Sequence, residues 1–205
     1  MIVIGINIAL WFEGWFNDLE DAETEQQYLA GLLDDLKTDI NQLETAIEFN
    51  SDKLEKLGEI IPALPSLPGA GAEAQASAIF TPSSYHFFEP SDFTYRSMQE
   101  SGDFRLLSDA DTKTRLLKLV RQYRRIDTLQ QNFMQALDDG YIPLLMTGFD
   151  IMAQRVTDPG FLENQLFRNF FPYTYQEVET RLAFYRSAQK QAQQLVEIIE
   201  VQVSD

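Results

Sequence analysis

Apolar residues recur three and four positions apart along the first third of the chain, which is the spacing of one face of an α-helix. The series begins at Leu29 and contains one polar member, Asn50; its other members are Leu33, Leu36, Ile40, Leu43, Ile47, Leu54, Leu57 and Ile61. No proline occurs between Asp18 and Ile61, and Pro62 and Pro65 follow directly. Because proline disfavours helix in the residue before it, we predict one long helix over residues 18–61.

A second series predicts a helix from Ser108 to about Asp139, with Ser108 and Asp111 as a capping box. Its members are Leu116, Leu119, Tyr123, Ile126, Gln130, Phe133 and Leu137. A third series follows Pro172 to the C-terminus, and its members are Tyr175, Val178, Leu182, Tyr185, Gln189, Ala192, Val196, Ile199 and Val203. Three long helices with apolar faces predict an all-α fold, an elongated bundle in which these faces pack together.

Each series carries one polar residue at a core position, namely Asn50, Gln130 and Gln189. Such a residue fixes register or partner choice at some cost in stability. If the three lie at one level, their amides would bond to one another in a core polar layer. The alternative for Asn50 is a partly exposed position near its helix end.

Two shorter helices complete the predicted bundle. One spans residues 91–101 and ends at Gly102, which accepts left-handed backbone. The other spans residues 158–169, with Asp158 as its cap and Pro159 at the first helical position. Its aromatic residues form either a plug of the bundle or a partner surface, and the candidate interaction residues are Phe161, Phe167, Phe170 and Phe171.

Two segments between the helices have weak periodicity. Residues 62–82 combine Pro, Gly and Ala with almost no charge, which predicts a flexible connector without a core of its own. This connector lies within one helical domain that spans residues 18–205. Gly140, Pro143 and Gly148 predict a turn that carries apolar residues over one end of the bundle.

The chain begins with the apolar run MIVIGINIALWF. Twelve helical residues span roughly 18 Å, whereas the hydrocarbon core of a bilayer is about 30 Å thick. Aromatic side chains gather at lipid headgroups, so we interpret residues 1–17 as the distal part of a membrane anchor whose proximal half is missing. The predicted membrane-interface residues are Trp11, Phe12, Trp15 and Phe16. The alternative is a buried helical start in a soluble protein.

Charge adds to this picture. The 32 acidic and 16 basic residues give a formal net charge of −16, which argues against nucleic acid as a partner because phosphate binding depends on Lys and Arg. Seven acidic residues, beginning with Asp18, Glu20 and Asp21, follow the aromatic residues before the first lysine, Lys37. Loops retained in the cytoplasm carry Lys and Arg, so this side is predicted to be the translocated one.

The helix predicted over residues 108–139 is the basic element of the chain, with Lys113, Arg115, Lys118, Arg121, Arg124 and Arg125. One interpretation is an anion or lipid-headgroup site. The other is charge complementarity with the acidic first helix, which lowers the self-repulsion of so acidic a chain.

Reactive chemistry is sparse. The sequence has no cysteine and one histidine, His86, so it lacks the companion ligands of a common metal site. Phosphate-binding glycine loops, His–carboxylate motifs and nucleophile elbows do not occur. We therefore expect a chain that is not an enzyme, with no catalytic residue, metal or cofactor, and a structural role for His86.

Three stretches carry a resemblance. They are VIGINIALWFEGW from Val3 to Trp15, the segment from Tyr28 to Asn50, and YRSMQESGDFRLLSD from Tyr95 to Asp109. They are similar, in the same order, to stretches of a family of bacterial membrane proteins that is common in Bacteroidetes-like genomes and is classified as a domain of unknown function.

In that family a basic N-terminus precedes a membrane helix, and a charged helix continues it. The family's Tyr-x-x-Leu-x-x-Ser-Gly stretch is matched at Tyr95, Ser101 and Gly102, with Met98 in the Leu place. The resemblance covers roughly residues 1–125. This chain departs from it at Asn7 and in lacking the basic start and the first half of the membrane helix.

The resemblance implies a single-pass protein of the bacterial inner membrane with a periplasmic helical domain, and it implies no activity. Our first hypothesis is a non-catalytic, membrane-anchored interaction domain, an accessory subunit of a larger membrane complex that contacts a protein partner or a second copy of itself. The alternative is a periplasmic sensor-like ligand-binding bundle. A pocket lined by convergent polar groups favours the sensor, whereas a solid core with exposed apolar residues favours the subunit.

Overall fold

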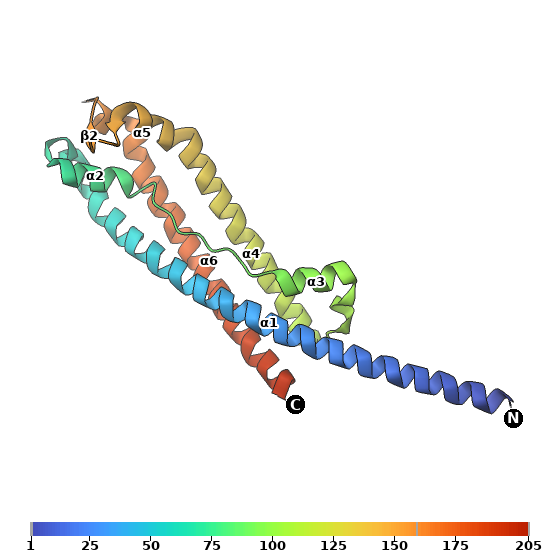
Figure 1. Ribbon diagram of the computed structural model, residues 1–205. Helices are drawn as coiled ribbons and strands as arrows, with labels where there is room; N and C mark the ends of the chain where they lie inside the picture. Colours follow the sequence, from blue (N-terminus) through green and yellow to red (C-terminus); the bar gives the residue numbers. More distant parts are fainter. Residues whose placement is uncertain (1, 159, 205) are drawn as a thin grey trace. The chain divides into compact units, whose positions relative to one another are not determined.

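The computed structural model describes the backbone of residues 2–158 and 160–204, and the side chains of residues 15–158 and 160–204 (Figure 1). The all-α fold is confirmed. Its long helices are α1 (Ile2–Ala63), α4 (Ala110–Ala136) and α6 (Gln165–Ser204). The shorter elements are the helices α2 (Ala72–Phe80), α3 (Phe93–Ser101) and α5 (Ile142–Gly148) and the strands β1 (Phe149–Asp150) and β2 (Arg155–Val156).

The periodic segments form helices as predicted, with three close matches. Helix α1 contains residues 18–61 and ends one residue after Pro62. Helix α3 ends at Gly102, whose φ of 81° is the left-handed value that favours glycine. Every member of the series on the second long segment, from Leu116 to Leu137, is buried.

The prediction of a separate helix over residues 158–169 is wrong. A 3₁₀ turn at Phe161–Glu163 is followed by α6, which begins at Gln165 and continues through Pro172. The amides of Leu166 and Phe167 donate to Asn164 Oδ1, so Asn164 caps the helix. Pro172 is exposed near the start of α6, but Phe171 before it and Thr174 two residues after it are buried, and their packing offsets the one backbone hydrogen bond that proline removes.

Residues 62–82 are not a segment without a core. They form a 3₁₀ helix at Leu64–Gly69 followed by α2, and their buried residues are Leu64, Leu67, Ala76, Ala78, Ile79 and Pro82. Tyr141 Oη donates to the carbonyl of Ile79 at 2.6 Å. The apolar residues of this segment are spaced irregularly between prolines, and they are buried because they pack against residues of other helices.

The turn predicted around Gly140 and Pro143 is also helical. A π-helical turn at Leu137–Tyr141 leads directly into α5, whose second residue is Pro143. Because helical backbone precedes it, Pro143 removes one helical hydrogen bond, and the widened π turn lies where this bond is missing. A Cβ at Gly148 would overlap the ring of Phe161, so glycine permits this close approach.

The chain divides into two compact units, each containing parts of the three long helices. Unit 1 comprises Met1–Asn41, Pro90–Val120 and Lys190–Asp205, and unit 2 comprises Gln42–Glu89 and Arg121–Gln189.

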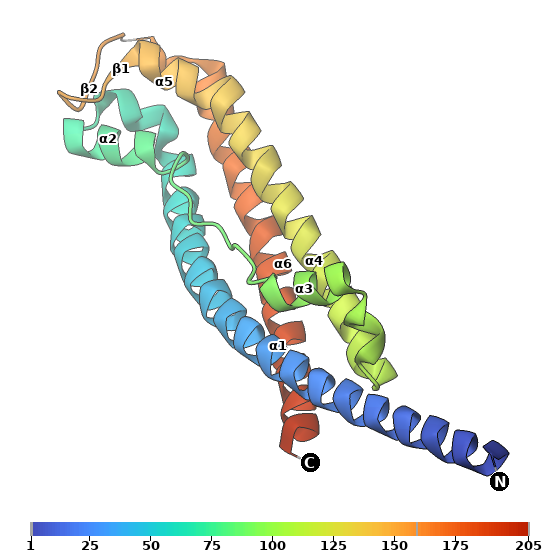
Figure 2. The same cartoon turned by 45° about the vertical axis from the view of Figure 1, so that its right-hand side comes forward.

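Unit 1 has an aliphatic core, with the buried residues Leu29, Leu32, Leu33, Leu36, Met98, Leu107, Leu116, Leu119, Leu195 and Ile199. Helix α3 lies beside α1 (Figure 2). Two carboxylates of α1 hold this region: Asp39 Oδ1 accepts from the amide of Ser91 at 2.6 Å, and Asp35 Oδ2 accepts from the amide of Thr94 at 2.9 Å. The buried carboxylate of Asp39 and the half-buried carboxylate of Asp35 thus each face a backbone donor.

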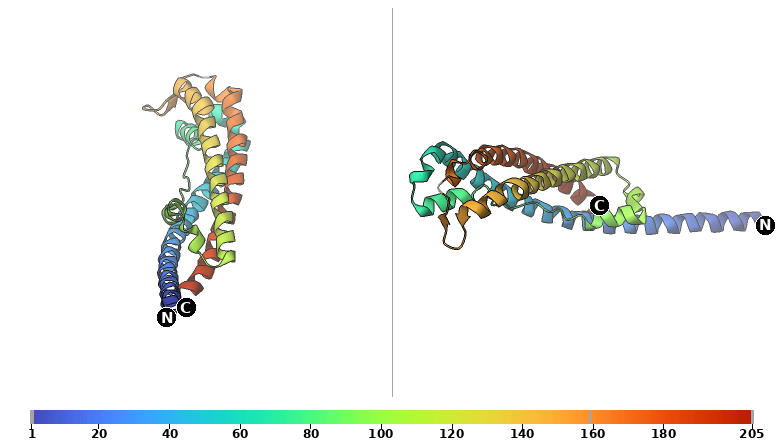
Figure 3. Two further views of the ribbon diagram at one scale, coloured as in Figure 1. Left: turned by 90° about the vertical axis from the view of Figure 1, so that its right-hand side faces the viewer. Right: turned by 90° about the horizontal axis from the view of Figure 1, so that it is seen from above.

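Unit 2 has an aromatic core. Helix α2 and the hairpin formed by β1 and β2 lie at one end of this unit (Figure 3). The predicted interaction residues Phe161, Phe167, Phe170 and Phe171 are all buried here, with at most 6% of their surface exposed. They are the plug of the bundle and not a partner surface, because Phe167 and Phe170 stack on Tyr141 and Phe167 makes tilted and edge-on contacts with Phe161 and Phe171.

Candidate functional site

Two cations lie inside the aromatic core of unit 2. The first is Lys53 of α1, which is only 3% exposed. Its ammonium donates to the carbonyl of Pro82 at 2.9 Å and to that of Ser84 at 2.5 Å. Burial, and after it the charge of Arg181, lowers the pKa of Lys53 to about 7. Two of the three ammonium donors therefore have acceptors, and both acceptors are neutral.

The second cation is Arg181 of α6, which is 1% exposed. Its guanidinium carbon lies 4.4 Å from the centroid of the Phe133 ring and 5.6 Å from that of Phe87. Lys53 Nζ lies 4.8 Å from the centroid of the same Phe133 ring. Within residues 15–158 and 160–204, no hydrogen-bond acceptor lies within reach of the three guanidinium nitrogens of Arg181.

The carboxylate with a charge effect on Arg181 is that of Glu177, one turn earlier in α6. It does not form an ion pair with Arg181, because the ion pairs of the described side chains join Lys37 to Glu200, Arg96 to Asp92 and Arg115 to Asp111. Burial is the dominant effect and lowers the pKa of Arg181. The guanidinium is thus desolvated without a counter-ion beside it.

Magnitudes show that the aromatic rings do not balance this burial. A desolvated cation–π contact contributes about 2 kcal/mol. Burying an ion costs several kcal/mol, and each polar group left without a partner adds about 1–3 kcal/mol. Phe133 and Phe87 offset part of this cost, and the remainder identifies the surroundings of Arg181 as an electrostatically incomplete site.

A recess of about 340 Å³ opens beside Lys53. Its walls are Phe49, Asp52, Lys56, Ser77, Phe80, Thr81 and Ser84, together with Lys53 itself. Thr81 Oγ1 donates to the carbonyl of Ser77, and Ser84 Oγ donates to that of Thr81, both at 2.8 Å. Lys53 thus lines this open recess, and its ammonium also lies over the buried ring of Phe133.

Hydrogen bonds to the segment after α2 fix the position of Phe87. Asn50 Nδ2 donates to the carbonyl of His86 at 3.1 Å. Gln130 bonds both the amide and the carbonyl of Phe88, at 3.0 Å each, and accepts from Tyr185 Oη at 2.7 Å. The His86 side chain is exposed beside Phe49, with ring centroids 5.8 Å apart, and its backbone carbonyl makes the structural contact.

The predicted polar layer takes a different form. Asn50 and Gln130 are buried, but their amides bond the backbone of residues 86 and 88 and not each other, because that segment presents unpaired backbone groups. Gln189 is half-buried, and the neighbouring Ala188 is buried in its place.

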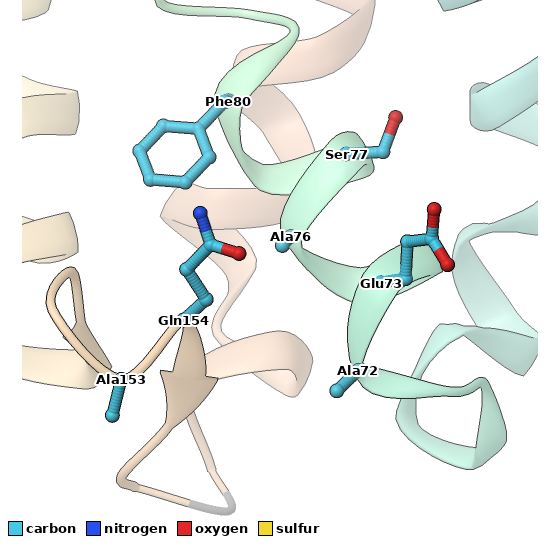
Figure 4. Close-up of a pocket in the computed structure, with 7 residues that line it drawn as sticks. All are labelled: Ala72, Glu73, Ala76, Ser77, Phe80, Ala153 and Gln154. Carbon is cyan, nitrogen blue, oxygen red and sulfur yellow. The ribbon is translucent and has the colours of Figure 1, made fainter.

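A second recess, of about 620 Å³, lies between α2 and the hairpin (Figure 4). Ala72, Ala76 and Phe80 form one wall, and Ala153 and Gln154 form the other. The Gln154 side chain extends between the two walls (Figure 4). Glu73 is the charged residue of this lining, so the recess brings together no acid–base pair.

Exposed apolar side chains occur in each unit. In unit 1 they include Trp15, Phe16 and Leu19 of α1, and in unit 2 they include Ile151 and Met152 of the hairpin. The side chains of Trp11 and Phe12 lie outside the described residues. None of the helices, as far as they are described, combines the length and the apolar character that crossing a membrane requires.

The basic residues of α4 make local contacts. Arg115 Nε lies 2.7 Å from Asp111 Oδ2 within the helix, and Lys113 Nζ donates to the carbonyl of Arg105. The ion pair between α1 and another long helix is that of Lys37 with Glu200 of α6, at 2.8 Å. Among the described side chains, no ion pair joins a basic residue of α4 to an acidic residue of α1.

Residues 1–134 match the model of a family of unknown function, DUF6090. The chain belongs to the DUF6090 family. This confirms the resemblance to a family of unknown function. No curated protein matches the chain significantly, and no solved structure does so. The part matched to DUF6090 includes Lys53, Phe87 and Phe133, whereas Arg181 lies beyond it.

Sequence reasoning missed both buried cations. Each was passed over in favour of an adjacent apolar residue, Leu54 beside Lys53 and Leu182 beside Arg181. A signal was present: Lys53 and Arg181 stand next to core positions in otherwise apolar series, one residue away from the expected face.

Proposed function

We propose that this DUF6090 protein is a non-catalytic, membrane-anchored interaction domain on the periplasmic side of a bacterial inner membrane, an accessory subunit of a larger membrane complex. The observation that carries the proposal is the course of α1. One uninterrupted helix leads from the apolar N-terminal run, through exposed Trp15 and Phe16, to the buried series that begins at Leu29. Such a helix couples a membrane-surface segment directly to a folded core.

The side of the membrane follows from charge. Asp18, Glu20, Asp21 and Glu23 are all exposed on α1 directly after Phe16. Juxtamembrane segments retained in the cytoplasm carry Lys and Arg, and this segment carries none before Lys37. A periplasmic location is therefore part of the proposal.

A partner subunit has exposed apolar side chains to cover. Met152 at the hairpin is 96% exposed, Met146 of α5 is 65% exposed and Ile151 is 45% exposed. Flexible methionine side chains are suited to protein contacts because they adapt to irregular surfaces. The aromatic residues of unit 2 pack together in one buried cluster, which supports the subunit over the sensor.

The two tryptophans provide a direct test of membrane contact, since Trp11 and Trp15 are the only ones in the chain. Tryptophan emission of the full chain should shift to shorter wavelength on titration with phosphatidylcholine vesicles, and brominated lipids should quench it. A variant with Trp15→Ser and Phe16→Ser should show a smaller shift. Emission that does not respond to vesicles would contradict membrane attachment.

Location and partnership need a test in cells. Alkaline phosphatase fused to the C-terminus of the chain, in its native membrane context, is expected to be active, because this enzyme matures only in the periplasm. A mild-detergent extract should then contain the chain in a stoichiometric complex. Release as a lone monomer by a salt wash would contradict both the anchor and the complex.

A second function, a sensor-like ligand-binding bundle, is favoured by one observation: the unmatched guanidinium of Arg181 inside unit 2. An interaction domain needs no buried charge of this kind. A ligand-binding domain does, when its ligand carries the opposite charge.

A further inference from the structure

We propose that unit 2 contains an internal binding site for a small oxyanion, a carboxylate or a phosphate-type group, held by the guanidinium of Arg181 with the ammonium of Lys53 as the second cation. This inference rests on the second of the two proposed functions, and it is independent of membrane attachment. Its basis is geometric: two cations lie over the same Phe133 ring, at 4.4 Å and 4.8 Å from its centroid.

The donor set selects the ligand class. Arg181 presents Nε, Nη1 and Nη2, all buried and all without an acceptor among the described side chains and backbone. A planar guanidinium fork matches the paired oxygens of a carboxylate or a phosphate-type anion. Lys53 has one donor left after its bonds to the carbonyls of Pro82 and Ser84. The site therefore lacks an acceptor, and a metal ion or a neutral ligand would not supply one of the required charge.

The protein around the site supplies no substitute. Two acidic residues could serve as counter-ions. Glu177 of α6 acts on Arg181 through its charge without a hydrogen bond, and Asp52 lines the open recess. Tyr173 and Tyr185 are neutral neighbours of Arg181 on its own helix. Tyr185 Oη donates to Gln130, and no hydrogen bond joins it to a guanidinium nitrogen of Arg181.

The recess beside Lys53 gives an anion access to Lys53. Lys53 and Lys56 line this recess of about 340 Å³ together with Asp52, whereas Arg181 is not among its lining residues. Lys53 also packs on the Phe133 ring, over which Arg181 lies as well. An anion that enters the recess therefore reaches Lys53 first, and Arg181 is the cation on the other side of this contact.

The test is thermal unfolding of the full chain titrated with inorganic phosphate, sulfate or acetate against chloride, at fixed pH and ionic strength. A ligand that binds only the folded state raises Tm in a saturable way. Phosphate, sulfate or acetate is expected to do so where chloride does not. Arg181→Met should weaken the apparent affinity by at least about tenfold, because it removes the charged hydrogen-bond donors. Lys53→Met should weaken it less.

The matched control is Arg186→Met, an exposed arginine on the same helix, which should leave the anion response unchanged. Should Arg181→Met fail to fold by circular dichroism, Arg181→Lys serves as the second variant, since it keeps one charge and loses the fork. Equal stabilisation of wild type and both Arg181 variants would overturn this site and leave ligand binding elsewhere intact. The absence of any saturable shift in wild type would overturn both the site and the sensor function.

Discussion

The two units differ in the hydrogen-bond partners of their buried charged side chains. In unit 1 the buried carboxylate of Asp39 accepts a hydrogen bond from the backbone amide of Ser91, and the half-buried Asp109 accepts from the amide of Thr112 at the start of α4. In unit 2 the buried ammonium of Lys53 reaches carbonyls, but the guanidinium of Arg181 reaches only aromatic rings. The difference lies in the partners: Asp39 has a hydrogen-bond donor within the protein, whereas the guanidinium nitrogens of Arg181 have no acceptor among the described residues.

The largest expected effect concerns the ring that both cations share. Phe133→Ala should lower the free energy of unfolding by about 3–5 kcal/mol, because it leaves a cavity and removes the π face beneath Lys53 and Arg181. Urea unfolding measures this. Phe93→Ala is the control, since Phe93 is 80% exposed in unit 1, and it should change stability by less than about 0.5 kcal/mol. A loss below about 1 kcal/mol at Phe133 would mean that the ring does not support the buried charges.

A pair of substitutions tests the contrast between the units itself. Asp39→Ala should cost about 1.5–3 kcal/mol, because it leaves the buried amide of Ser91 without its charged acceptor. Arg181→Met should be neutral or stabilising in anion-free buffer, because it removes a buried charge that has no counter-ion. Denaturant unfolding of both variants measures the change in the free energy of unfolding, which should be a decrease for Asp39→Ala and no change or an increase for Arg181→Met. Comparable destabilisation in both would show that Arg181 has protein partners equivalent to those of Asp39.

Measured per pH unit, the smallest effect is a slope with pH. The pKa of Lys53 falls from 10.5 to about 7 on folding, so between these values the unfolded chain holds a proton that the folded chain has released. Stability should therefore rise from about pH 7 towards pH 10.5, by at most about 1.4 kcal/mol per pH unit. Lys53→Met should remove this rise. Identical pH profiles for the variant and wild type, followed by chemical denaturation, would contradict a lowered pKa of Lys53.

The helices were predictable because their apolar spacing is long and regular, and α4 shows this best, since its whole predicted face is buried. The face of α1 was less predictable: Asp39 and Lys53 are buried, while the apolar residues directly after them, Ile40 and Leu54, are half-buried. A prediction from hydropathy places the apolar neighbour, and not the charged residue, on the buried face of the helix. Which side of a helix faces the core is decided by tertiary partners, here the backbone of residues 82–91.

The candidate site was not predictable for the same reason. A lysine and an arginine far apart in sequence become neighbours through Phe133, and only the packing of three helices brings them together. The aromatic plug could be recognised from its composition, but the choice between plug and partner surface depended on Tyr141 and on α2, a segment whose proline and glycine content predicted no core. Local composition indicates the structure that a segment forms by itself. The aromatic residues and α2 take their structure from packing against other segments, so composition alone does not predict it.

The most direct test of the central claim is a crystal structure of the full chain grown with selenate, an oxyanion whose selenium is located by anomalous scattering. An oxyanion site at Arg181 predicts a selenium peak in unit 2, with selenate oxygens within hydrogen-bond distance of the guanidinium, and no such peak in Arg181→Met crystals. A guanidinium whose nitrogens are all bonded to protein groups, with no selenium beside it, would contradict this site.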